Sequence, residues 1–117
     1  MKNADVNAIT CGQVDGTFTP ATLASVMTTH GLDVLHNRYS VRIKNCSHFK
    51  FDLFGEAVSI DADADSSNKM INDAQLVSSA LTRAGIRHRF EVYGPRDELV
   101  AYLHFNWPRK DQNLHET

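Results

Sequence analysis

The sequence lacks the segments that would place it in a membrane or mark it for export. No apolar run approaches the roughly 18 residues that a membrane-spanning helix needs. Residues 1–10 contain one lysine and no long apolar core, so they do not form a secretion signal. These absences predict a protein of the bacterial-type cytoplasm that has no membrane partner.

The chain also lacks an excess of charge of either sign. It has 12 basic and 14 acidic residues, well mixed, and a net charge of −2 over 117 residues. Nucleic-acid-binding domains and membrane-surface patches both depend on clustered Lys and Arg, so neither nucleic acid nor membrane is expected as a partner. The hydrophobic share of 42% and the charged share of 22% predict one ordinary globular domain spanning 1–117.

Cysteine is scarce, and motifs that carry chemistry are missing. Cys11 and Cys46 are the two cysteines, and without an export signal they are predicted to be reduced, small, buried side chains. The sequence has no Gly-x-Ser-x-Gly motif and no phosphate-binding glycine loop. These patterns therefore indicate no catalytic residue and no cofactor.

An acidic ladder is the first candidate for a binding site. Asp61, Asp63 and Asp65 occupy every second position, and together with the polar residues after them they resemble the start of a calcium-binding loop. Such a loop requires Gly at its sixth position and Glu at its twelfth, where this chain has Ser66 and Asn72. We interpret the ladder as a solvated strand face that leads into a helix N-terminus, where negative charge is favourable. Adventitious binding of a divalent cation is the alternative.

The six histidines do not show the spacing of a metal site, because none are paired at the i, i+4 spacing of helical ligands. His88 shares its side of a predicted strand with Phe90 and Val92, which predicts a buried histidine in the core or at its rim. Cys46 and His48 stand two residues apart in a predicted turn, and this spacing does not establish a catalytic pair.

Two amphipathic segments predict helices. Thr19 is a plausible N-cap, Pro20 suits the first helical position, and Gly31 suits the left-handed residue after the last turn. A second helix, capped within residues 65–67, is predicted to run to about Ala84, with apolar residues on one side over four turns.

Alternating apolar and polar residues predict the strands. The last strand carries Leu99, Leu103 and Trp107 on one side, together with Ala101 and Phe105. Short connections imply antiparallel neighbours, and the polar residues 109–117 are predicted to be a frayed end. The predicted strands are one short strand within residues 5–11, followed by residues 39–44, 49–53, 58–63, 88–93 and 99–107.

These elements predict an α+β fold. It consists of a mainly antiparallel sheet of about five to six strands with two helices packed on one face, in the order β-α-β-β-β-α-β-β. The element order resembles that of ferredoxin-like folds and of tandem βαββ units such as the glyoxalase-like fold. The resemblance implies a fold and no site residues.

If both helices share one face of the sheet, several aromatic side chains point away from them. Aromatic residues on a solvated face predict a surface that a partner covers, and a second copy of the chain is the commonest partner. The alternative is that the helices do not share a face, and that one of them covers these aromatics. The predicted binding face comprises Phe54, Arg89, Glu91, Tyr93, Tyr102, His104 and Asn106, with Val100 beside them.

Two functions are compatible with this pattern. The first is a small non-enzymatic binding or interaction domain, a homodimer acting through the exposed sheet face, such as an immunity-type inhibitor or a mobile-cassette accessory protein. The second is a small ligand-binding protein or enzyme with a polar cleft around His104, Tyr102 and Glu91, joined by Asp61, which could transfer protons or use a metal. A cavity that contains these side chains would favour the second function.

Overall fold

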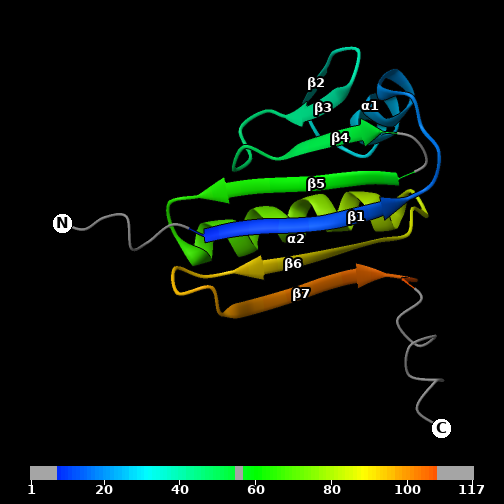
Figure 1. Ribbon diagram of the computed structural model, residues 1–117. Helices are drawn as coiled ribbons and strands as arrows, with labels where there is room; N and C mark the ends of the chain where they lie inside the picture. The colour runs from blue at the N-terminus through cyan, green and yellow to red at the C-terminus, as the bar shows by residue number, and fades with distance from the viewer. Residues whose placement is uncertain (1–7, 55–56, 108–117) are drawn as a thin grey trace, which may run out of the picture.

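In the computed structural model, the chain forms one seven-stranded antiparallel sheet and two α-helices (Figure 1). The structure describes residues 8–54 and 57–107, so the predicted frayed end at 109–117 lies outside the described residues. Neither described helix is long and apolar enough to cross a membrane. The elements are β1 (Ala8–Asp15), α1 (Pro20–Thr29), β2 (Val34–His36), β3 (Ser40–Ile43), β4 (Lys50–Phe54), β5 (Ala57–Ala64), α2 (Ser67–Arg83), β6 (His88–Tyr93) and β7 (Leu99–Phe105).

The strands are ordered β2-β3-β4-β5-β1-β6-β7 across the sheet. Every neighbouring pair is antiparallel. Because β5 and β6 each pair antiparallel with β1, they run parallel to each other, and α2 connects them. The first strand in the chain therefore lies between two strands that come much later in the sequence (Figure 1).

The predicted strand number and the resemblance to a ferredoxin-like fold are wrong. The order is β-α-β-β-β-β-α-β-β, with four strands between the helices, whereas a ferredoxin-like fold has two. The additional strand is β2, which pairs with β3 through three residues. A segment this short cannot show a clear alternation, so its pattern did not indicate a strand.

One face of the sheet forms the hydrophobic core. Buried residues of α1, such as Leu23 and Met27, and of α2, such as Met70 and Val77, belong to one cluster with alternate residues of the strands. Both helices therefore pack against the same side of the sheet. One row of paired residues on this side crosses six strands and consists of Val41, Phe51, Ile60, Gly12, Phe90 and Leu103.

Gly12 supplies no side chain to that row, because β1 and β6 approach each other closely there. A Cβ atom at this position would lie 2.1 Å from the backbone carbonyl oxygen of Arg89. Only glycine is compatible with this spacing.

The helix boundaries follow the predicted capping residues. Thr19 is the N-cap of α1, and its side chain accepts a hydrogen bond from the backbone N–H of Thr22. Ser66, one of the three candidates, is the N-cap of α2. Gly31 and Gly85 follow the two helices with φ angles of 97° and 75°, in the left-handed region that favours glycine.

Two side chains lie on a different side of the sheet from the one predicted, and Cys11 is exposed although it was predicted to be buried. A register shift beside Tyr93 places Leu99 opposite it, and Leu99 is 56% exposed. Trp107 was predicted to face the core, but it follows Asn106, whose φ is 53°, and its ring lies under the Arg89 guanidinium instead. Both cysteines are free as predicted, and Cys46 is buried. Cys11 is exposed, because β1 directs its odd-numbered residues away from the helices.

His88 is buried and fully hydrogen-bonded, as predicted. Its Nδ1 lies 2.9 Å from the carbonyl oxygen of Ile86, and its Nε2 lies 2.7 Å from the hydroxyl of Ser78 on α2. Because a carbonyl oxygen only accepts, Nδ1–H donates, and Nε2 of the neutral ring accepts from Ser78. Burial lowers the pKa of His88, an effect that exceeds the opposing effect of the bond to Ile86.

The His88 environment predicts that acid destabilises the fold. Below the unfolded pKa of about 6.5, the unfolded chain binds a proton that native His88 does not, so the free energy of unfolding falls by up to about 1.4 kcal/mol per pH unit. Urea denaturation between about pH 7 and about pH 5 measures this slope. The slope should shrink in His88→Gln and persist in His36→Gln, which changes an exposed histidine. Equal slopes in wild type and His88→Gln would contradict the assignment.

The degree of burial along the core row from Val41 to Leu103 predicts how much stability an alanine substitution removes at each position. Phe90 is 0% exposed, so Phe90→Ala should lower the free energy of unfolding by about 3–5 kcal/mol. Leu103 is only partly buried on the edge strand, so Leu103→Ala should cost about 2 kcal/mol, at the lower end of the range for buried leucines. A larger loss for Leu103→Ala than for Phe90→Ala would show that the core is centred elsewhere.

Candidate functional site

The face of β1, β6 and β7 that points away from the helices carries most of the predicted site residues. The strand registers arrange its side chains in three rows, each with one residue from each strand. We call these nine residues the outer patch. Its rows are Ile9–Tyr93–Leu99, Cys11–Glu91–Tyr102 and Gln13–Arg89–His104.

Arg89 lies at the centre of the polar contacts in the outer patch. Its Nη1 donates to Glu91 Oε2 at 2.7 Å, and its Nε and Nη2 donate to the Gln13 side-chain oxygen at 3.2 and 3.1 Å. On the outer side, its Cζ lies 5.6 Å from the centre of the Trp107 ring. A guanidinium held by two acceptors and an aromatic ring has little freedom left to lose on binding a partner.

Glu91, in the middle row, contacts both Arg89 in the polar row Gln13–Arg89–His104 and Tyr93 in the apolar row Ile9–Tyr93–Leu99. The Tyr93 hydroxyl donates to Glu91 Oε1 at 2.9 Å, and the Cys11 sulfur lies 4.0 Å from the same oxygen. The bond to Glu91 raises the pKa of the Tyr93 phenol, because the carboxylate stabilises its protonated form. Partial shielding of the sulfur from water by its neighbours, and then the charge of Glu91, raise the pKa of Cys11. The exposed thiol therefore lacks the surroundings that create a reactive thiolate.

The structure brings most of the predicted binding face together. Arg89, Glu91 and Tyr93 are in contact, and the Tyr102 and His104 rings pack together with centres 5.0 Å apart. Asn106 lies past the end of β7, where its backbone carbonyl accepts a hydrogen bond from Arg87. The side chain of Phe54 lies outside the described part of the structure.

Sequence reasoning missed Gln13 and Trp107 as members of this surface. Gln13 was missed because the first strand was predicted only within residues 5–11, whereas β1 continues to Asp15. Extending the alternation of Ala8 and Thr10 to Val14 would have placed Gln13 on the outer face. Trp107 carries no such signal, since the left-handed backbone of Asn106 turns it over.

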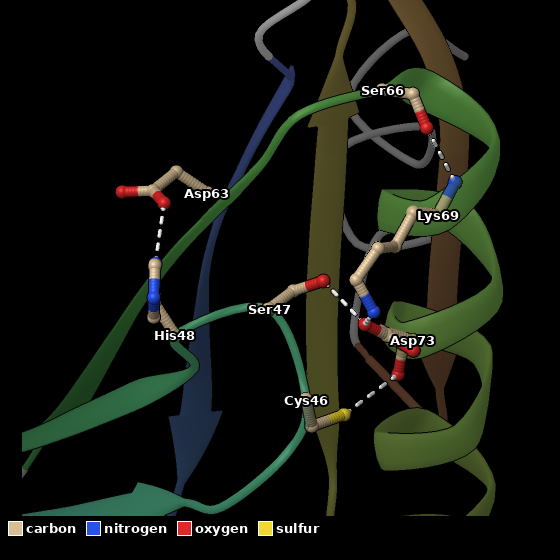
Figure 2. Close-up of polar contacts among 7 residues, drawn as sticks. All are labelled: Cys46, Ser47, His48, Asp63, Ser66, Lys69 and Asp73. Carbon is tan, nitrogen blue, oxygen red and sulfur yellow. Dashed lines mark hydrogen bonds and ion pairs between the residues drawn. The ribbon is translucent and has the colours of Figure 1, made fainter.

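The turn between β3 and β4 forms a second polar cluster, beside the first turns of α2 (Figure 2). Asn45, Ser47 and His48 have φ angles of 59°, 45° and 52°. The left-handed region costs non-glycine residues about 1–2 kcal/mol each, so surrounding contacts must hold the turn. The Ser47 hydroxyl donates to the Asp73 carboxylate, which also binds Lys69 Nζ at 2.9 Å (Figure 2).

Cys46 anchors this turn and is not an activated nucleophile. It is 4% exposed, and its sulfur lies 3.9 Å from the Asp73 backbone carbonyl oxygen. Burial, and then the charge of Asp73, raise the pKa of Cys46 to about 11. The thiol therefore remains protonated at neutral pH, which disfavours thiolate chemistry.

A cavity of about 560 Å³ opens between this turn, the end of β5 and α2. At its lip, His48 Nδ1 lies 2.7 Å from Asp63 Oδ1, and both side chains are largely exposed (Figure 2). Asp61 and Asp65 are also exposed. Within residues 8–54 and 57–107, no three His, Cys, Asp or Glu side chains converge as metal ligands would. The exposure of all three aspartates is what the interpretation of the ladder as a solvated strand face predicts.

The predicted polar cleft around His104, Tyr102 and Glu91 does not coincide with the described cavities. Four cavities, of about 190 to 560 Å³, are lined by residues of α1, of β2 and β3, and of the turn before β4 with its neighbours on β5 and α2. None of the four is lined by these three residues. Comparison of the chain with protein-family models, curated proteins and solved structures found no match.

The contact between Tyr93 and Glu91 gives a spectroscopic prediction. Glu91→Gln removes the carboxylate, so the raised pKa of the Tyr93 phenol should fall towards its ordinary value of about 10. Tyrosinate absorbance during an alkaline titration measures the change, and Tyr93→Phe identifies the transition that belongs to this residue. An unchanged titration in Glu91→Gln would show that the two side chains do not interact in solution.

Proposed function

We propose that this protein is a small non-enzymatic binding domain that acts through the outer patch and forms a homodimer. The observation that supports the proposal most is the composition of the patch. It combines a preordered polar network with exposed apolar side chains, on a sheet face that no described helix covers. A domain of this kind suits an immunity-type inhibitor or a mobile-cassette accessory protein.

The residue types in and beside the patch are those that dominate protein interfaces. Arginine, tyrosine and tryptophan are enriched at the centres of interfaces, where they contribute most of the binding free energy. Arg89, Tyr93 and Trp107 supply all three types around one network. Because the guanidinium is already ordered, less side-chain entropy is lost when a partner binds.

The apolar row Ile9–Tyr93–Leu99 exposes large apolar side chains, which favours burial of the patch by a partner. Ile9 is 44% exposed and Leu99 is 56% exposed, and the registers place both beside Tyr93. Val100, on the same strand, is 37% exposed. Large apolar side chains gathered on a sheet face are typical of interaction surfaces, whereas single exposed ones are not informative.

A second copy of the chain fits the patch because its charges are balanced internally. Arg89 and Glu91 form an ion pair within each patch, so two patches would approach without repulsion between like charges. A two-fold dimer is also the commonest arrangement of identical chains. The alternative function, a polar cleft around His104, Tyr102 and Glu91, is less favoured because these residues lie on the open face.

Self-association through the outer patch predicts the effect of removing its tyrosines. Tyr93→Ser with Tyr102→Ser should convert the dimer into a monomer while the fold is retained, since both side chains point away from the helices. Light scattering measures the mass, and circular dichroism checks the fold. Tyr39→Ser is the matched control, because Tyr39 is 58% exposed at the far end of the sheet. A wild-type chain that is monomeric at all concentrations, or a dimer that survives the double substitution, would contradict the proposal.

A further inference from the structure

The outer side of β7 is one of the two edges of the sheet. β7 is the last strand in the sheet order, so none of the described strands pairs with its outer side. Its seven residues, Leu-Val-Ala-Tyr-Leu-His-Phe, include no Lys, Arg, Asp, Glu, Gly or Pro. Edge strands normally carry such residues, or are very short, because an open edge otherwise pairs with another chain.

The opposite edge of the sheet shows the protection that β7 lacks. β2 has three residues and lies between Asp33 and Arg38. It is too short and too closely flanked by charge to serve as a template for another strand. The two edges therefore differ, and on the C-terminal side of the bulge near its start β7 is the less protected of the two.

We propose that β7 pairs antiparallel with β7 of a second copy, so that the two sheets join edge to edge across a two-fold axis. This inference rests on the proposed homodimer, and it moves the contact between the two copies from the open face of the outer patch to its β7 edge, where Tyr102 and not Tyr93 lies at the contact. A register centred on Tyr102 pairs Ala101–Leu103, which follow the bulge beside Leu99, with the same three residues of the second copy. Tyr102 then lies opposite Tyr102 of the second copy, and Leu103 lies opposite its Ala101.

Charge and apolar burial both favour a second copy as the occupant of this edge. Within β7, no residue is acidic or basic apart from His104. No like charges therefore meet along the strand pair. The core row that begins at Val41 ends at the partly buried Leu103, and Ala101 of the second copy would extend it.

The edge pairing also joins the two outer patches. Each patch ends at β7, where the middle row finishes with Tyr102. Joining the sheets at this strand places the two Tyr102 side chains next to each other on the open face. The dimer would then present one continuous surface of twice the width, which a further protein partner could recognise.

Disulfide trapping tests the register. In a Cys11→Ser background, which removes the exposed thiol, Tyr102→Cys should give a covalent dimer on mild oxidation. Opposite residues of an antiparallel pair have Cα atoms about 4.5–5.5 Å apart, within the range of a disulfide. Tyr93→Cys in the same background is the matched control, since three strand spacings of about 4.8 Å alone would separate its two copies by more than about 14 Å.

Hydrogen exchange tests the same pairing in the wild-type chain. The β7 amides that point away from β6 should exchange rapidly in the monomer and slowly in the dimer. Their exchange should slow roughly tenfold once dimer exceeds monomer about ten to one, because exchange then occurs through the monomer. Amides of β2, at the other edge, should show no dependence on protein concentration.

The outcomes separate this inference from the proposed function. A covalent dimer with Tyr102→Cys but not with Tyr93→Cys, together with protection of β7 that depends on concentration, supports edge pairing. A wild-type dimer whose β7 amides remain unprotected, or a dimer that Tyr93→Cys traps as readily as Tyr102→Cys, overturns edge pairing and leaves the proposed function intact. A monomer at every concentration overturns both.

Discussion

The two helices both cover the same face of the seven-stranded sheet, and this arrangement determines the role of every strand residue. Alternate side chains of a strand point to opposite faces, so each strand divides its residues between the core and the open side. In β6, His88, Phe90 and Val92 are fully buried, whereas Arg89 and Glu91 reach the other face. The same strand register therefore places one set of side chains in the core and the other set in the outer patch. A shift of one residue in the pairing of a strand would move each of its side chains to the opposite face.

Much of the fold could be predicted because its signals are local. The boundaries of β6 were predicted correctly, since a strict alternation runs through all six residues, and Thr19 marked the start of α1 through its capping side chain. The strand order could not be predicted in the same way. The position of β1 between β5 and β6 depends on contacts between distant segments, and the three residues of β2 are too few to show a period. Element order alone therefore suggested the wrong topology.

The candidate site was likewise predictable only where its contacts are local in sequence. Arg89, Glu91 and Tyr93 could be grouped from sequence, because residues two apart in one strand share a face. The contact of Arg89 with Gln13 joins residues 76 positions apart and depends on the register between β1 and β6. The left-handed turn at Asn45, Ser47 and His48 contains no glycine, so its conformation had no local sequence signal. Its conformation depends on Asp73 in α2, which the local sequence does not reveal.

The missing side chain at Gly12 has a consequence for the opposite face of the sheet. The atom that leaves no room for a Cβ is the carbonyl oxygen of Arg89, the residue whose guanidinium organises the outer patch. Any larger residue at position 12 would wedge β6 away from β1 and carry that guanidinium with it. A substitution at this one glycine would thus displace Arg89 and alter the outer patch, although position 12 belongs to the core row on the other face of the sheet.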